Sequence, residues 1–135
     1  MVRTKFPHFT PEEAEVLDEF IRKRIIVGEW KFDVRLPSNR AKEVDIKDPT
    51  LKLFWEKVTA KRIDALCETP ESIHIIEVKR YMLASGIGQL LLYSYLYNKH
   101  FKPSKPIFLW LIAKYPDPDV IEWCKLHGIK TWTMF

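Results

Sequence analysis

Hydrophobic and polar residues alternate in several short segments of the chain, and this period of two predicts β-strands. Trp30, Phe32 and Val34 alternate with charged residues in the clearest example. Two short apolar segments flank the polar turn Thr69–Ser72, and a run that is apolar on both faces follows Pro106, as expected of a central strand. The predicted strands are 29–36, 51–58, 62–68, 73–80, 107–113 and 129–134.

Three helices are predicted from apolar periodicity and from their caps. Thr10, Pro11 and Glu13 combine a hydroxyl N-cap, a proline at the first helical position and a glutamate three residues after the cap. Asp117 starts the last helix, and the polar segment 37–50, which is bracketed by prolines, is predicted to be a surface loop. The predicted helices are 11–24, 83–98 and 118–127.

The order of these elements predicts an α/β fold. Read as α-β-β-β-α-β-α-β, with the mixed pattern at 51–58 as a further strand, the chain describes a mixed central sheet flanked by helices on both faces. A length of 135 residues suits one domain with a single core. We therefore expect residues 1–135 to form one domain.

Composition narrows the class of protein. Hydrophobic residues make up 47% and charged residues 30%, as in soluble globular chains. The two cysteines lack metal-binding spacing, which argues against a disulfide or a structural zinc, and the apolar runs fall short of the roughly 20 residues of a membrane span. We expect an intracellular, cytoplasmic protein. The net charge of +4 suggests a polyanionic partner such as nucleic acid, and amide depletion suggests a thermophilic source.

Two acidic residues interrupt the apolar strands on either side of the turn Thr69–Ser72. If this turn is a four-residue hairpin loop, counting back along both strands places Asp64 opposite Glu77. Directly opposed residues of an antiparallel pair point to the same side of the sheet, about 5 Å apart. Lys79 lies two residues after Glu77 and shares that side. The hairpin therefore predicts two carboxylates and an ammonium group in one patch.

Such a patch needs positive charge, because two buried carboxylates repel each other and lose their hydration. Lys79 supplies one charge, and a divalent cation with hard oxygen ligands, such as Mg²⁺, supplies two. A cation held there can polarise a phosphoryl oxygen and lower the pKa of a bound water, while Lys79 positions that water or stabilises developing charge. The alternative is a structural salt-bridge cluster at a sheet edge.

The sequence Ile63-Asp64, followed by Glu77-Val78-Lys79 and by Gln89 early in a helix, resembles the active site of the PD-(D/E)XK nuclease superfamily. The resemblance implies a restriction-endonuclease-like core. It also implies that both acids and the Val78 carbonyl hold Mg²⁺ or Mn²⁺, that Lys79 assists the attacking water, and that Gln89 helps to arrange it. The family's proline before the first acid is replaced here by Ile63.

The segment Gln89 to Tyr93 is similar to the Q-x-x-x-Y signature of RecB-like nucleases. Gln89 and Tyr93 lie one helical turn apart and share a face. Members of the family often add a glutamate from the first helix, and Glu13 lies on the apolar face of that helix, so it is our candidate for a further ligand or water-binding residue. The alternative for Glu13 is a helix-capping role alone.

Further candidates for nucleic-acid contact are Arg80, Tyr93 and Tyr97. The alternatives are an exposed strand end for Arg80 and packing at a rim for the two tyrosines. Strand parity turns His74 away from Glu77, towards the core. Residues assigned to the core are Cys67, Met82, Trp110, Trp123 and Cys124.

The resemblance implies a Mg²⁺-dependent deoxyribonuclease that needs no organic cofactor, and an archaeal or viral source is expected. Two alternatives stay open. Archaeal Holliday-junction resolvases are similar in size and basic character and act as homodimers on four-way junctions. A non-catalytic nucleic-acid-binding module would keep the fold and bind without cleaving. The partner is DNA for the deoxyribonuclease and for the resolvase.

Overall fold

The computed structural model describes residues 8–37 and 39–135. Its centre is a five-stranded sheet in the order β1-β2-β3-β4-β5. β2 is antiparallel to both β1 and β3, whereas β3, β4 and β5 are parallel to one another. The strands are β1 (Glu29–Leu36), β2 (Lys61–Glu68), β3 (Ile73–Tyr81), β4 (Ile107–Tyr115) and β5 (Lys130–Thr133). The predicted α/β class with a mixed sheet is confirmed.

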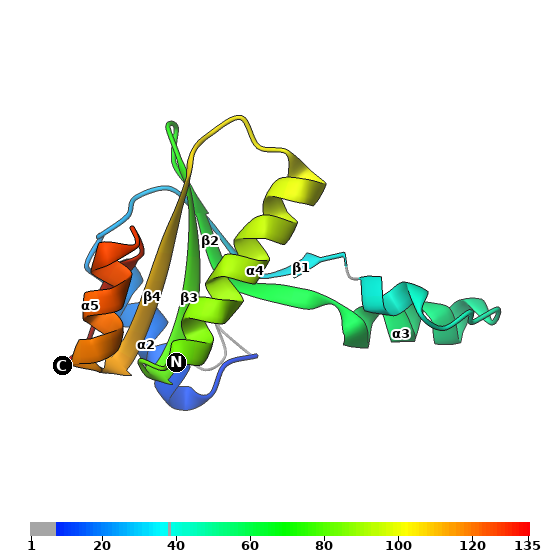
Figure 1. Cartoon of the computed structure of the whole chain (residues 1–135), viewed down its shortest axis with the longest axis horizontal. Helices are drawn as coiled ribbons and strands as arrows, with labels where there is room; N and C mark the ends of the chain where they lie inside the picture. The colour runs from blue at the N-terminus through cyan, green and yellow to red at the C-terminus, as the bar shows by residue number, and fades with distance from the viewer. Residues whose placement is uncertain (1–7, 38) are drawn as a thin grey trace.

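Helices cover both faces of this sheet, as Figure 1 shows. One cluster of buried residues lies between the sheet and α2, on what we call the α2 face. A second cluster lies beneath α4 and α5, on the α4 face. The described helices are α2 (Pro11–Arg22), α3 (Pro49–Thr59), α4 (Ala84–Phe101) and α5 (Pro118–Leu126), with a 3-10 helix η1 (Asn39–Lys42). Among the described residues, no helix is both long and apolar enough to cross a membrane.

The start of α2 is built as its sequence predicts. The Thr10 hydroxyl accepts the Glu13 N–H, and the Glu13 carboxylate accepts the Thr10 N–H, which completes a capping box. Phe20 of the same helix is fully buried and makes edge contacts with Trp110 and Trp132, at ring-centroid distances of 5.3 and 5.4 Å. The helix ends at Arg22 rather than near residue 24, because Arg24 has a φ of +55°.

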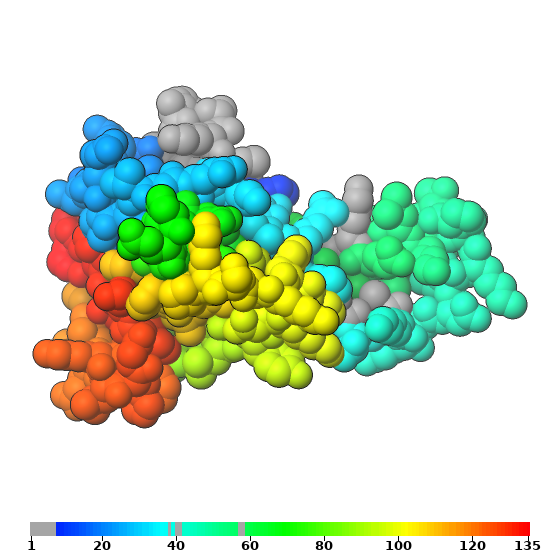
Figure 2. All heavy atoms as spheres, turned by 90° about the horizontal axis from the view of Figure 1, so that it is seen from above, coloured from blue at the N-terminus to red at the C-terminus, as the bar shows by residue number. Residues whose placement is uncertain are grey.

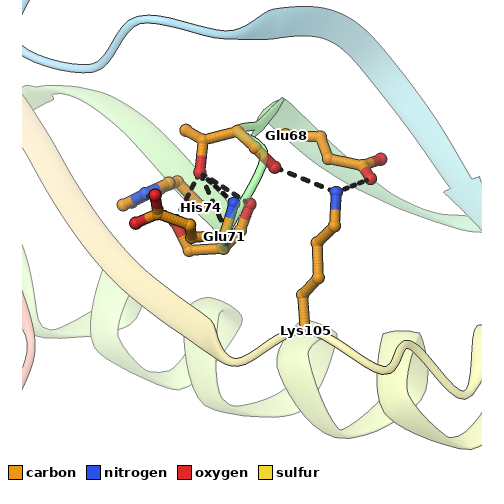
Figure 3. A network of polar contacts seen from close by, with 6 residues as sticks. Glu68, Glu71, His74 and Lys105 are labelled. Atoms are coloured by element: carbon orange, nitrogen blue, oxygen red, sulfur yellow. Dashed lines mark hydrogen bonds and ion pairs between the residues drawn. The ribbon is translucent and has the colours of Figure 1, made fainter.

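The hairpin between β2 and β3 fixes the strand register. Its loop is closed by a bond from the Thr69 N–H to the Ser72 carbonyl. Lys105 binds both the Glu68 carboxylate and the Thr69 carbonyl, which ties the loop to the segment before β4 (Figure 3). Glu68 pairs with Ile73 and Ala65 with Ile76, so the predicted register is confirmed.

The predicted strand at 51–58 is wrong, because these residues form α3. The Asp48 carboxylate accepts the N–H groups of Thr50 and Leu51, and Pro49 takes the first helical position, which together nucleate a helix. Leu51, Leu53 and Phe54 are exposed, because α3 projects from the sheet beside η1 (Figures 1 and 2). The segment 37–50, predicted as a loop, contains η1.

Other core predictions are mostly confirmed. Cys67, Met82 and Cys124 are buried, and both thiols are free. Trp110 packs against the α2-face cluster. Trp123 was assigned to the core wrongly: it is exposed and stacks on the His127 ring, 3.8 Å away, because it lies on the outer side of α5.

Candidate active site

The two acids lie where the pairing of β2 with β3 ends. The described ladder runs from Glu68↔Ile73 to Ala65↔Ile76, so Asp64 and Glu77 are the next opposed residues. The Asp64 carboxylate accepts the Val78 N–H at 2.9 Å, and the Asp64 and Glu77 carboxyl groups lie close enough to share a hydrogen bond. The structure therefore brings the predicted acid pair together.

Lys79 completes this group on the α4 face. Ile73 and Ile75 belong to the α4-face cluster, so strand alternation places Glu77 and Lys79 on the same side. The Lys79 ammonium lies 3.6 Å from the Glu77 carboxylate, and the two side chains are 21% and 5% exposed. An acid pair and an ammonium group thus share one largely desolvated patch, as the hairpin register predicts.

Burial dominates the electrostatics of the pair. It raises the pKa of Glu77 to about 9, with a further contribution from the negative charge of Asp64. It also raises the pKa of Asp64 to about 6, although the hydrogen bond from the Val78 N–H opposes this change. At neutral pH the pair therefore retains a proton, which the carboxyl–carboxyl hydrogen bond requires.

Gly86 lets the start of α4 approach Lys79. A Cβ atom at this position would lie 2.6 Å from the Leu111 Cδ1 and 3.6 Å from the Lys79 Cε. A larger residue at position 86 would therefore push the helix away from the sheet. The sequence places a glycine at the helix entrance, but only the packing shows why it is needed there.

Gln89 follows Gly86 by one turn of α4 and is half-buried. Its Oε1 atom is buried and has no hydrogen-bond partner within residues 8–37 and 39–135. A buried acceptor without a donor costs about 1–3 kcal/mol. The Gln89 Oε1 atom can therefore accept a further hydrogen bond. It belongs to α4, whose first turn packs over Lys79.

Glu13 has the capping role and also lies within electrostatic range of the acid pair. Its carboxylate accepts the Thr10 N–H at 3.0 Å, and its negative charge is one of the smaller factors that raise the pKa of Asp64. The first turn of α2 also contacts β3 through Glu12, which binds Arg80 at 2.9 Å. The structure confirms that Glu13 caps the helix, and its role as a further ligand or water-binding residue remains a prediction.

The predicted nucleic-acid contacts are dispersed. Arg80 points to the α2 face, where Glu12 binds it. Tyr93 and Tyr97 share a face of α4, as predicted, and both pack against the α4-face cluster. Burial and the nearby Glu68 raise the pKa of Tyr97, which places this tyrosine towards the hairpin loop, away from the acid pair.

His74 lies on the opposite side of β3 from Glu77, as predicted. Its ring accepts the Trp110 indole N–H at 3.0 Å and lies 2.9 Å from the Ser72 hydroxyl (Figure 3 shows its place beside the hairpin). Burial lowers its pKa. It is a structural residue with both ring nitrogens engaged.

The donors around the acid pair are oxygen atoms of the kind that hold hard divalent cations. Val78 directs its N–H towards Asp64, and the N–H and carbonyl of one strand residue point to the same edge, so the Val78 carbonyl also faces β2. With the two carboxyl groups it makes a set of three oxygens that fits Mg²⁺ or Mn²⁺. Among the described residues, no three or more His, Cys, Asp or Glu side chains are grouped as for a metal ion, and this set has only two.

Comparisons with family models, curated proteins and solved structures gave no match to this chain.

Proposed function

We propose that the chain is a metal-dependent nuclease that hydrolyses DNA phosphodiester bonds, with a restriction-endonuclease-like core. The observation that carries the proposal is the contact between Asp64 and Glu77, with Lys79 3.6 Å from Glu77. A buried pair of like charges is destabilising unless a cation or a proton offsets it. Such a pair adds little to the stability of a fold, whereas a cation-binding site needs two carboxylates close together.

The metal would be held by Asp64, Glu77 and the Val78 carbonyl, with Glu13 near enough to orient a metal-bound water. A divalent cation bound there supplies Lewis acidity towards a phosphoryl oxygen and a water of lowered pKa. Glu77 must give up its proton before it can serve as a ligand, because its pKa is raised by burial. Metal binding should therefore release protons near neutral pH.

Two further side chains would act directly on the reacting groups. Lys79 carries a positive charge beside the acid pair and would stabilise negative charge that develops on the phosphate. The Gln89 Oε1 atom accepts no described hydrogen bond and would hold a proton of the attacking water. The capping bonds of Glu13 fix the first turn of α2 on the other face of the sheet.

The test compares Lys79→Ala with Lys99→Ala, an exposed lysine of α4, so that both variants lose one positive charge. With Mg²⁺ or Mn²⁺, we expect the wild type and Lys99→Ala to cleave DNA, and Lys79→Ala to lose at least about 100-fold in rate. Equal cleavage by Lys79→Ala and the wild type would refute the assignment.

Linear duplex, single-stranded, flap and four-way-junction DNA should be assayed side by side. Preferential cutting of the junction by a dimer would indicate a resolvase. Binding to DNA without metal dependence, together with no cleavage of any substrate, would instead indicate a non-catalytic binding module.

A further inference from the structure

Three aromatic rings stand in a row across the end of the sheet, just past Lys79. Tyr81 of β3 pairs with Tyr115 of β4, and their ring centroids lie 5.1 Å apart with an interplanar angle of 26°. Phe135 stacks on the other side of Tyr115, at 5.8 Å and 21°. We call these three residues the aromatic row. Its rings are nearly parallel, and Tyr115 is half-buried between the other two, so the row presents the rings of Tyr81 and Phe135 to solvent.

The aromatic row is exposed to solvent and lies beside positive charge. The Tyr81 side chain is 49% exposed and Phe135 is 71% exposed. The Arg80 guanidinium carbon lies 5.0 Å from the centre of the Tyr81 ring, and the Lys114 ammonium lies 5.8 Å from the centre of the Tyr115 ring. Both cations are ion-paired, Arg80 with Glu12 and Lys114 with Glu12 and Glu15, so they are held close to the row and their charge is balanced. The exposed rings suit a planar aromatic ligand.

The row is continuous with the candidate active site. Glu77, Lys79 and Tyr81 alternate along β3 and point to the same side of the sheet. Four residues of strand span about 13 Å, which corresponds to about four nucleotides of a stacked strand at 3.4 Å each. A nucleic acid with a phosphate at Glu77 would therefore place bases a few nucleotides away beside Tyr81.

We propose that the aromatic row binds unpaired nucleobases of the strand whose backbone lies at Asp64 and Glu77. This inference rests on the proposed nuclease function and specifies its substrate as single-stranded DNA or a frayed end. Aromatic side chains stack on any base, because every base has a π-face, but paired bases inside a duplex do not present that face. Stacking of this kind contributes about 5- to 150-fold in affinity per base.

Binding of labelled single-stranded DNA is measured with EDTA, so that cleavage does not interfere, at one fixed salt concentration. Three ligands of equal length are compared: a single strand with bases, a single strand of abasic sites, and a duplex. The variant is Tyr81→Leu. The matched control is Tyr95→Leu, whose tyrosine is 62% exposed but lies on the outer side of α4.

We expect Tyr81→Leu to bind the base-bearing strand at least about 5-fold more weakly, with no change for the abasic strand or the duplex. Tyr95→Leu should match the wild type for all three, and Tyr81→Trp should restore the affinity. If Tyr81→Leu fails to fold by circular dichroism, Phe135→Leu gives the same comparison at the far end of the row.

Unchanged affinity for the base-bearing strand, or an equal loss for all three ligands, would overturn the stacking site. Loss of self-association in Tyr81→Leu, without loss of DNA affinity, would overturn it in favour of a protein contact. The proposed function fails separately: a wild type that binds single strands but never cleaves with Mg²⁺ or Mn²⁺ keeps the stacking site and loses the nuclease.

Discussion

Replacing Glu77 by glutamine should remove a pH-dependent destabilisation of the metal-free protein. Burial, followed by the charge of Asp64, raises the pKa of Glu77 from 4.5 to about 9. Between these two values the unfolded chain has released a proton that the folded chain still binds, so rising pH favours the unfolded state. The stability contributed by Glu77 is complete below pH 4.5 and is lost as pH rises towards 9.

The size of this effect follows from the titration. Within that window the free energy of unfolding falls by about 1.4 kcal/mol for each pH unit. Burial raises the pKa of Asp64 only to about 6, so between pH 6.5 and 8.5 the change comes mainly from Glu77. Over those two pH units the loss is about 3 kcal/mol, a large part of the 5–15 kcal/mol typical of a domain.

Urea denaturation in EDTA, followed by tryptophan fluorescence at pH 6.5, 7.5 and 8.5, gives the required free energies. The advantage of Glu77→Gln over the wild type should grow by about 3 kcal/mol across this range. Glu71→Gln, an exposed acid in the hairpin loop, is the control and should show no such growth. If the Glu77→Gln and wild-type curves stay parallel, the folded protein does not retain the proton.

Two further outcomes follow from the same geometry. Mg²⁺ or Mn²⁺ should raise the melting temperature more at pH 8.5 than at pH 6.5, because a smaller fraction of the carboxyl pair is protonated at the higher pH. Asp64→Ala should lose this rise. A rise that does not depend on pH would count against this site. Gly86→Ala should destabilise the fold by about 1–3 kcal/mol, because its Cβ would lie 2.6 Å from Leu111. Gly88→Ala is the matched control, since a Cβ added there would meet none of the described residues packed around the helix within 4 Å, and it should stabilise α4 by up to about 1 kcal/mol. The reverse order of the two variants in urea denaturation would contradict the packing.

The hairpin could be predicted from the sequence because its constraints are local. A four-residue loop fixes the register, and strand alternation then fixes the side on which each residue lies. The acid pair and Lys79 follow from these two facts alone. The capping box at Thr10 is local in the same sense, and it too was predicted correctly.

Two features do not follow from the pattern of apolar and polar residues. Residues 51–58 have a mixed pattern, which is compatible with a strand. The Asp48 cap and Pro49 at the first helical position favour a helix instead. Several apolar side chains of this helix are exposed to solvent. The aromatic row depends on parallel pairing between Tyr81 and Tyr115, which are 34 residues apart. The local pattern of either strand does not predict that pairing.

The position of the acid pair at the end of a strand ladder also explains how the fold holds it. The paired residues of β2 and β3 end at Ala65 and Ile76, and just beyond them the Asp64 carboxylate accepts the Val78 N–H. The backbone therefore orients Asp64, and a side chain held by strands is positioned more rigidly than one on a loop. Burial and the charge of Asp64 raise the pKa of Glu77 to about 9, so the carboxyl pair retains a proton at neutral pH. A cation that replaces this proton would offset the same charge repulsion that destabilises the metal-free protein at high pH.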